Sequence, residues 1–444
     1  MNERDSTHII AELQSKENYT ITHNPKEADL ILINTCSVRE KPERKLFSEI
    51  GIFANIKKKD AKIGICGCTA SALGEKIIKK APSVDFVLGA RNVSKITQIL
   101  NKPKAVEVAI NYDESHYEFA LPQESNFRAL INISIGCDKK CSYCIVPHTR
   151  GKEISIPLDM ILKEAEFRVK NGAKEIVLLG QNVNNYGARF STMHKKVDFT
   201  ILLREISKID GLQRIKFVSP HPLHTDDDFI MEFANNPKIA KYIHLPLQSG
   251  SSKVLHDMKR GYSKEWFLNR VQKFRELVPN VGIGTDIIVA FPTESDDDFN
   301  ETLEVVEKVG FDTMYSFIYS PRENTSAFDL TEIPREIAQK RLEILQNLHK
   351  KTLQKKAKNE LGKIYNVMIE NIAKSDKFKA ESTKLLKRDS TKKGRDIKNL
   401  TSFEGRSDNG KLVHITSEKS LRCGEIYSVK ITQSKNGSLF GEII

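Results

Sequence analysis

Short apolar runs alternate with longer amphipathic segments along the first 120 residues of the chain. Each apolar run has the length of a buried strand, and each amphipathic segment has the period of a helix. The predicted strands are 28–34, 62–67 and 84–88, and the predicted helices are 5–13, 40–59 and 71–80. Because parallel strands need helical crossovers, this order predicts a doubly wound α/β domain, although such a domain normally begins with a strand.

A polar stretch at 111–126 predicts a linker, and a second, more regular alternation follows it. The predicted strands are 129–135, 175–179, 214–218, 242–245, 282–290 and 313–319, with helices such as 157–170, 266–277 and 295–309 between them. Six strand-helix units predict a partial (β/α)6 barrel. In such barrels the chemistry takes place at the carboxyl ends of the strands.

The last part of the chain changes character. A long helical stretch, 335–361, precedes short β runs separated by Gly and Asn turns, at 365–370, 411–415, 427–432 and 439–444. This pattern predicts a small β-barrel of oligonucleotide-binding type. The predicted domains are therefore 1–120, 127–355 and 361–444.

Charge is concentrated at the C-terminal end. The formal net charge is +12, and residues 352–444 hold 20 basic and 11 acidic side chains, a local excess of +9. One basic run comprises Lys384, Lys387, Arg388, Lys392, Lys393 and Arg395. Such an excess fits a polyanion partner or a solubilising surface. No apolar run is long enough to span a bilayer and the N-terminus is polar, so we expect a cytoplasmic protein without membrane contact.

Three of the seven cysteines fall within eight residues, as Cys137, Cys141 and Cys144. This C-x3-C-x2-C loop directly follows the first predicted barrel strand. Three thiolates can hold three irons of a [4Fe–4S] cluster and leave the fourth open, whereas a closed cluster takes four cysteines. A zinc site with His148 as fourth ligand is the alternative. Cys423 is expected to be a small core residue.

Several motifs carry a family resemblance. SIGCDKKCSYCIVPHTRGKEISIP begins at Ser134, and LLGQNVNNYG, HLPLQSGS and YSFIYSPR follow near later strand ends. With NTCSVR at Asn34 and GCTA at Gly67, they are similar to motifs of methylthiotransferases in the radical S-adenosylmethionine superfamily. The resemblance implies that S-adenosylmethionine binds the open iron and is cleaved to a 5′-deoxyadenosyl radical. The C-terminal barrel is similar to a TRAM domain, which implies RNA binding.

Within this family, the stretch Gln181–Asn184 favours the branch that makes 2-methylthio-N6-isopentenyladenosine at position 37 of tRNA. Carbon 2 of adenine is neither acidic nor electrophilic, so a radical route suits it. The alternatives are methylthiolation of threonylcarbamoyl-adenosine in tRNA or of a ribosomal protein, and a non-catalytic zinc-stabilised RNA-binding protein. The resemblance also implies a flavodoxin or ferredoxin as electron donor, and help from iron–sulfur assembly machinery. We expect a monomer.

The resemblance further implies an auxiliary [4Fe–4S] cluster on three cysteines of the N-terminal domain. Cys36 and Cys68 match two of them. The third belongs in a motif that would precede Met1, so we hypothesise that the chain as written lacks about one strand and one cluster ligand. Cys66 is the other candidate, since a strand would place it on the same face as Cys68, but a buried thiol beside the site is the favoured interpretation.

Polar residues at strand ends are candidates for the S-adenosylmethionine pocket. Tyr143 occupies the aromatic position before the last loop cysteine, which in the family lies near the adenine. The others are Gln181, Asn182, Ser219, Gln248, Ser249 and Asp286. His221 is a further candidate for this pocket, although its place between two prolines is also typical of a rigid turn. The stretches 290–294 and 321–324 depart from the glycine-rich motifs of the family.

Overall fold

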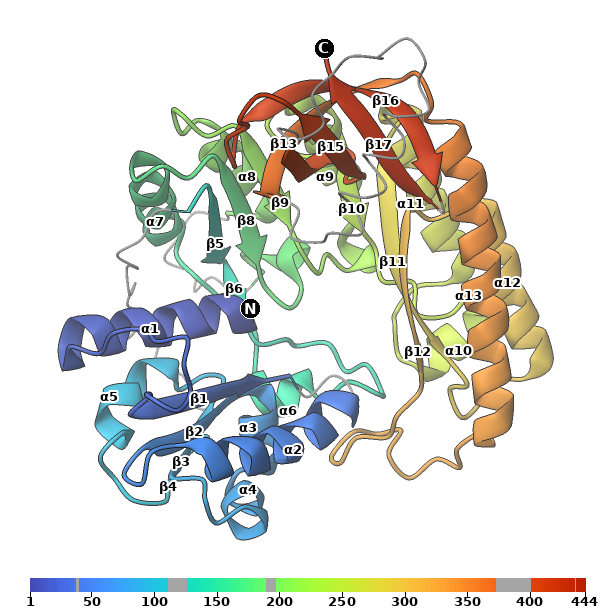
Figure 1. The fold of residues 1–444 in the computed structure, drawn as a ribbon. Helices are drawn as coiled ribbons and strands as arrows, with labels where there is room; N and C mark the ends of the chain where they lie inside the picture. Colours follow the sequence, from blue (N-terminus) through green and yellow to red (C-terminus); the bar gives the residue numbers. More distant parts are fainter. Residues whose placement is uncertain (37–39, 111–125, 189–196, 373–400, 436) are drawn as a thin grey trace.

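The computed structural model describes residues 1–36, 40–110, 126–188, 197–372, 401–435 and 437–444. Figure 1 shows an N-terminal α/β unit, a central curved sheet covered by helices, and a small β-barrel at the C-terminal end. The α/β fold class with a C-terminal barrel is therefore confirmed. The expected linker lies almost wholly outside the described residues. Within the described part of the chain, no helix is both long and apolar enough to cross a membrane.

The N-terminal unit is a parallel sheet in the order β1-β2-β3-β4. Its elements are α1 (Asn2–Glu17), β1 (Leu30–Thr35), α2 (Glu40–Ile56), β2 (Lys62–Gly67), α3 (Cys68–Leu73), α4 (Glu75–Lys80), β3 (Phe86–Gly89), α5 (Ile96–Ile99) and β4 (Ala105–Glu107). One apolar cluster joins the sheet to α2, α3 and α4, and a second joins it to α1 and α5. Both faces are thus covered, as predicted.

Two details of this unit differ from the prediction. The helix expected at 71–80 is divided into α3 and α4 by Gly74, whose φ of 48° interrupts the helical path. Strand β4 was not predicted, because three residues, Ala105–Glu107, are too few to show a period.

Six parallel strands form the central barrel. They are β5 (Arg128–Asn132), β8 (Glu175–Leu179), β9 (Arg214–Phe217), β10 (Tyr242–His244), β11 (Gly282–Val289) and β12 (Thr313–Ile318). Two three-stranded sheets, β5-β8-β9 and β10-β11-β12, are linked where Ile215 pairs with Ile239. The connecting helices are α7 (Leu158–Lys170), α8 (Phe199–Ser207), α9 (Asp227–Asn235), α10 (Ser252–Asp257), α11 (Lys264–Leu277) and α12 (Asp296–Val309).

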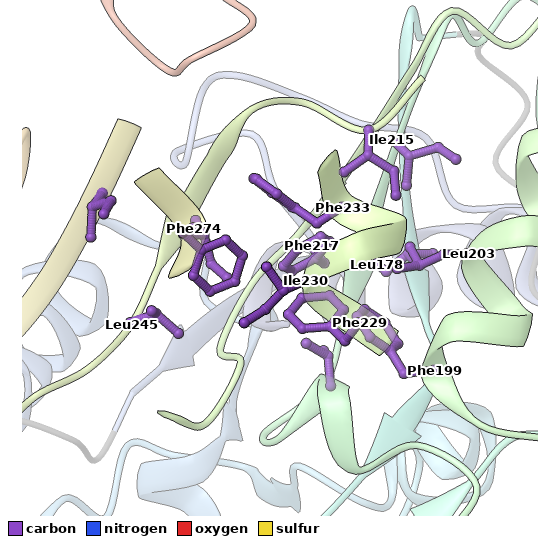
Figure 2. Close-up of a cluster of buried hydrophobic side chains, with 14 of the residues drawn as sticks. Leu178, Phe199, Leu203, Ile215, Phe217, Phe229, Ile230, Phe233, Leu245 and Phe274 are labelled. Atoms are coloured by element: carbon purple, nitrogen blue, oxygen red, sulfur yellow. The ribbon is translucent and has the colours of Figure 1, made fainter. Parts of the chain in front are cut away.

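Aromatic side chains fill the space between these strands and helices (Figure 2). Phe233 and Phe274 meet edge to face with ring centroids 5.2 Å apart, and Phe199 meets Phe217 at 5.3 Å. Burying each such ring contributes about 1.5–3 kcal/mol. This core makes the strands a rigid frame for the residues at their carboxyl ends.

The C-terminal part begins with the 24-residue helix α13 (Arg335–Lys358). The closed barrel follows, with strands β13 (Ile364–Ile372), β14 (Thr401–Ser407), β15 (Leu412–Ser417), β16 (Ile426–Lys435) and β17 (Ser438–Ile443). The predicted basic run at 384–395 lies outside the described residues.

A buried ion network joins this barrel to the central sheet. Glu175, the first residue of β8, accepts from Arg214 at 2.6 Å and lies 3.0 Å from Lys216. Lys216 is also 3.6 Å from Glu370 of β13. The C-terminal barrel therefore lies at the amino ends of the central strands, away from their carboxyl ends.

Candidate active site

The cysteine loop follows β6 (Ser134–Ile135) and ends at α6 (Val146–Arg150), at the carboxyl end of β5. Gly136 permits its sharp entry, with a φ of 79°. A Cβ there would lie 2.1 Å from the carbonyl oxygen of Lys152, so a larger residue would push the loop away. The structure therefore places the three cysteines at the mouth of the barrel, as the sequence predicts.

The far side of the loop is held by Ser142. Its hydroxyl donates to the carbonyl of Asp257 at 2.8 Å, and its amide donates to the carbonyl of Met258 at 3.1 Å. Its own carbonyl accepts from the amide of Ala327 at 2.8 Å. The neighbouring Tyr143 packs against a buried cluster that includes Met258. These contacts fix the loop against α10 and the segment after β12.

A buried arginine, Arg260, reaches the loop. Its guanidinium donates to the Cys141 sulfur at 3.3 Å, to the carbonyl of Pro246 at 3.1 Å and to the Tyr262 hydroxyl at 3.1 Å. Burial raises the pKa of Cys144 to about 12, so a bound metal must displace its proton. Among the described residues no three metal-ligating side chains are already gathered into a metal-binding group.

Backbone strain marks three neighbouring strand ends. Ser219, Gln248 and Ala290 follow β9, β10 and β11, and all three have left-handed backbones, with φ of 59°, 75° and 57°. A non-glycine residue in this conformation costs of order 1 kcal/mol and persists where the surroundings enforce it. Three such residues on adjacent carboxyl ends indicate a functional face.

Buried polar atoms without partners gather at the same face. The Asn182 side chain is 1% exposed, and neither its oxygen nor its nitrogen has a hydrogen-bond partner. Asn132 Oδ1 and His221 Nε2 are likewise unpaired. Burial, with Arg260 nearby, lowers the pKa of His221, so its imidazole is neutral. Each unpaired group costs about 1–3 kcal/mol. Such groups fit a bound ligand with ammonium, carboxylate and hydroxyl groups, which S-adenosylmethionine carries.

The other predicted pocket residues have protein partners. Ser249 is fully buried and lies 3.4 Å from the Thr302 hydroxyl, and Asp286 lies 3.2 Å from His244 Nε2. The Gln181 amide contacts the Met1 sulfur. Roles of these residues in binding the cofactor stay predictions.

A second pair of cysteines faces the barrel from the N-terminal sheet. Cys36 follows β1 and Cys68 begins α3, so both lie at the carboxyl edge of that sheet. Burial raises the pKa of Cys68, and the nearby Cys36 adds to the rise. Arg150, at the end of α6, donates to the Cys68 sulfur at 3.2 Å and to Asp5 at 2.8 Å. One buried arginine thus spans the distance from the triplet loop to Cys68.

The cysteine predictions have mixed outcomes: Cys66 is buried, as favoured, whereas its shared face with Cys68 and the core position of Cys423 are wrong. Cys66 does not share a face with Cys68, because Gly67, with a φ of 95°, ends the strand and Cys68 starts a helix. Cys66 instead packs in the apolar cluster under α1 and α5. Cys423 is exposed, because it lies in the turn between β15 and β16 rather than in a strand.

A cavity of about 870 Å³ is lined by residues that neighbour Cys68 and Cys144 in sequence, but by none of the cysteines themselves. Thr69 and Ser71 of α3 line one side, close to Cys68, and Ile145, just beyond Cys144, lines another. The segment after β12 and the start of α13 complete it, through residues that include Phe328 and Arg335. The cavity therefore borders the segments that carry Cys68 and Cys144.

The roles of Arg150 and Arg260 were not predicted. Arg150 falls inside the motif that begins at Ser134, but its spacing gives no sign of Cys68 as a partner. Arg260 follows Lys259 in a stretch without a recognised motif. Both contacts join residues distant in sequence, which a single sequence does not pair.

Several known protein families and proteins are similar to this chain. Residues 131–306 match the radical SAM superfamily, and residues 1–89 match the uncharacterized protein family UPF0004. The tRNA-2-methylthio-N(6)-dimethylallyladenosine synthase of Helicobacter hepaticus is 60% identical over 447 residues, covering all of this chain and 92% of the relative. The chain belongs to this synthase family. The enzyme of the same name from Helicobacter pylori strain 26695 is 60% identical over 441 residues, covering 99% of this chain and 96% of its own.

The chain is therefore a radical SAM tRNA methylthiotransferase, and membership implies a [4Fe–4S] cluster and S-adenosylmethionine as cofactors. The non-catalytic zinc-protein alternative is set aside. Among solved structures, the radical S-adenosylmethionine methyltransferase TsrM from Kitasatospora setae matches with a TM-score of 0.49 and 13% identity, over 67% of this chain and 66% of its own.

Proposed function

We propose that this chain attaches a methylthio group to carbon 2 of N6-dimethylallyladenosine at position 37 of tRNA. The observation that carries the proposal is 60% identity along the whole chain to synthases named for this product. The cysteine loop at the barrel mouth supports it independently. The threonylcarbamoyl-adenosine and ribosomal-protein alternatives have no comparable observation in their favour.

The triplet loop would hold the radical cluster through Cys137, Cys141 and Cys144. A bound cluster and S-adenosylmethionine would supply a radical able to take the hydrogen from carbon 2. The chain itself would position the cofactors and the substrate and would exclude water from the site. Asn132, Asn182 and His221 offer unpaired polar atoms to the cofactor's amino-acid and ribose groups.

Cys36 and Cys68 would hold an auxiliary cluster on the other side of the cavity. Arg150 offers a cation and a hydrogen bond to the Cys68 sulfur. The described residues contribute these two thiols, and Cys66 points into the core behind them.

The cavity between the two sites would receive the flipped-out nucleoside. Its volume of about 870 Å³ falls within the usual range for small-ligand pockets. Ile318, Ile333 and Phe328 give its wall an apolar part that suits a dimethylallyl group. Chemistry on a base requires it unstacked, so an enclosed pocket is expected. The electron donor, a flavodoxin or ferredoxin, and the assembly machinery are also proposals.

The test is nucleoside mass spectrometry of tRNA from a strain that lacks its own enzyme and carries this chain. We expect 2-methylthio-N6-dimethylallyladenosine with the unchanged chain and with Cys423→Ser, an exposed remote control. Cys144→Ser should leave only dimethylallyladenosine. A methylthio group on threonylcarbamoyl-adenosine instead would establish the sibling activity, and no methylthio nucleoside at all would contradict the proposal.

A further inference from the structure

A second, smaller groove lies far from the cysteines, between the last turns of α13 and the hairpin that joins β16 to β17. Its volume is about 450 Å³. Its lining residues are Lys351, Gln354, Lys355, Lys358, Ser434 and Gly437. The hairpin comes close to the helix here, since a Cβ on Gly437 would lie 3.7 Å from the Leu353 Cβ. The groove thus joins the long helix to the C-terminal barrel.

The three lysines of this groove share one face of α13. Their spacing of four and then three residues places them one above another along the helix. All three are exposed, and in the described part of the chain none makes an ion pair. Lys356, on another face, instead lies 2.6 Å from Asp312. No acidic residue lines the groove.

Like charges stacked along a helix repel one another, so this lysine face reduces helix stability in the free protein. A polyanion would remove that repulsion and release its own counterions. Gln354 and Ser434 add neutral donors that suit phosphate oxygens. The chemistry of the groove therefore matches a nucleic-acid backbone.

The helix also relates this groove to the cavity near the cysteines. Arg335, the first residue of α13, lines that cavity. Lys351 and Lys358 follow it by 16 and 23 residues, which corresponds to roughly 24 to 35 Å along a helix. Figure 1 shows α13 as one continuous helix running up to the C-terminal barrel. If the target nucleotide of an RNA occupies the cavity, only a part of the RNA well away from that nucleotide can reach the groove.

We propose that Lys351, Lys355 and Lys358 form a phosphate-binding track that holds the body of a full-length tRNA while its anticodon loop occupies the cavity. The inference rests on the proposed function for the identity of the RNA. It assigns α13 a part in substrate binding, in addition to the C-terminal barrel.

The test compares the holoenzyme with the triple variant K351E/K355E/K358E. Binding of full-length tRNA and of an isolated anticodon stem-loop is measured by filter binding over a range of salt. We expect full-length tRNA to bind at least about tenfold more weakly, with the slope of log K against log salt reduced by about 2 to 3. Stem-loop affinity should be unchanged. The KM for tRNA should rise while kcat stays constant.

A matched control carries the same charge change elsewhere. K26E/K59E/K102E alters three exposed lysines that precede β1, β2 and β4, at the edge of the N-terminal sheet opposite its cysteines. It should leave both affinities near those of the unchanged chain, and K351R/K355R/K358R should do the same. Equal losses in the triple variant and the control, an unchanged salt slope, or an equal loss for the stem-loop would overturn the proposal. None of these results depends on which nucleoside is made.

Discussion

The two cysteine sites are assembled in different ways, although segments next to both border the same cavity. Cys137, Cys141 and Cys144 lie on one loop, close together in the sequence. Cys36 and Cys68 come from two elements of a sheet and meet only because β1 and β2 are paired in register. The first site is therefore local, whereas the second depends on the tertiary structure around it.

Each site also has a buried arginine. One of the two makes its contacts within the barrel, and the other joins the barrel to the N-terminal unit. Arg260 contacts only groups of the barrel, among them Pro246 and Tyr262. Arg150 crosses from the barrel to the N-terminal unit and is paired with a carboxylate, Asp5. The barrel therefore organises the site of the cysteine triplet by itself and contributes Arg150 to the site of Cys36 and Cys68.

The largest expected effect comes from the local site. Cys141→Ser removes one of the three thiols proposed to hold the radical cluster. Cleavage of S-adenosylmethionine should then fall to background, and the methylthio nucleoside should be lost with it. Chromatographic measurement of 5′-deoxyadenosine provides the readout. Wild-type cleavage in this variant would mean that the loop does not hold the radical cluster.

Replacing the two arginines should affect the two sites differently, and each effect should be smaller than that of losing a cysteine. A hydrogen bond to a charged partner is worth about 1.5–3 kcal/mol, which corresponds to roughly tenfold or more. Arg260→Gln should lower 5′-deoxyadenosine formation by about that factor. Arg150→Gln should leave this rate intact but lower the amount of methylthio nucleoside formed per 5′-deoxyadenosine.

Arg270→Gln is the control for these two variants, because Arg270 is also buried and lies 2.8 Å from an acid, Asp227, but on the outer helices. It should change neither the rate of 5′-deoxyadenosine formation nor the amount of methylthio nucleoside formed per 5′-deoxyadenosine. If Arg150→Gln and Arg260→Gln gave the same pattern of losses, the division between the two sites would fail.

The smallest effect on chemistry is expected at the opposite end of the barrel. Burial alone would raise the pKa of Glu175, but Lys216, Arg214 and Arg128 outweigh it and lower the pKa to about 2. The ionised carboxylate therefore stabilises the fold above about pH 4.5, and this contribution is lost as the pH falls towards 2. Glu175→Gln should cost about 3–5 kcal/mol near neutral pH, with a smaller difference in acid.

Chemical unfolding at several pH values measures this cost. In the folded variant, the amount of methylthio nucleoside formed per 5′-deoxyadenosine should be unchanged. A difference that grows towards low pH would contradict the assignment of the ion network.

This contrast also explains what could be predicted from the sequence. The six barrel strands were predicted because their apolar runs alternate regularly with helical segments, and the triplet because its spacing is local. The burial of Cys66 was predicted, but its separation from the face of Cys68 was not, because one glycine, Gly67, changes strand into helix between the two cysteines. The contact between Arg150 and Cys68 joins residues 82 positions apart and exists only in the folded chain.

The most direct test of the account is to measure both products in one reaction with Cys68→Ser. The chain, dimethylallyladenosine-containing tRNA, S-adenosylmethionine and a reductant are combined, and 5′-deoxyadenosine and methylthio nucleoside are quantified together. The account predicts that cleavage of S-adenosylmethionine continues while methylthio nucleoside is absent. Methylthio product at the wild-type ratio would contradict a role for Cys68, and loss of cleavage would contradict the independence of the two sites.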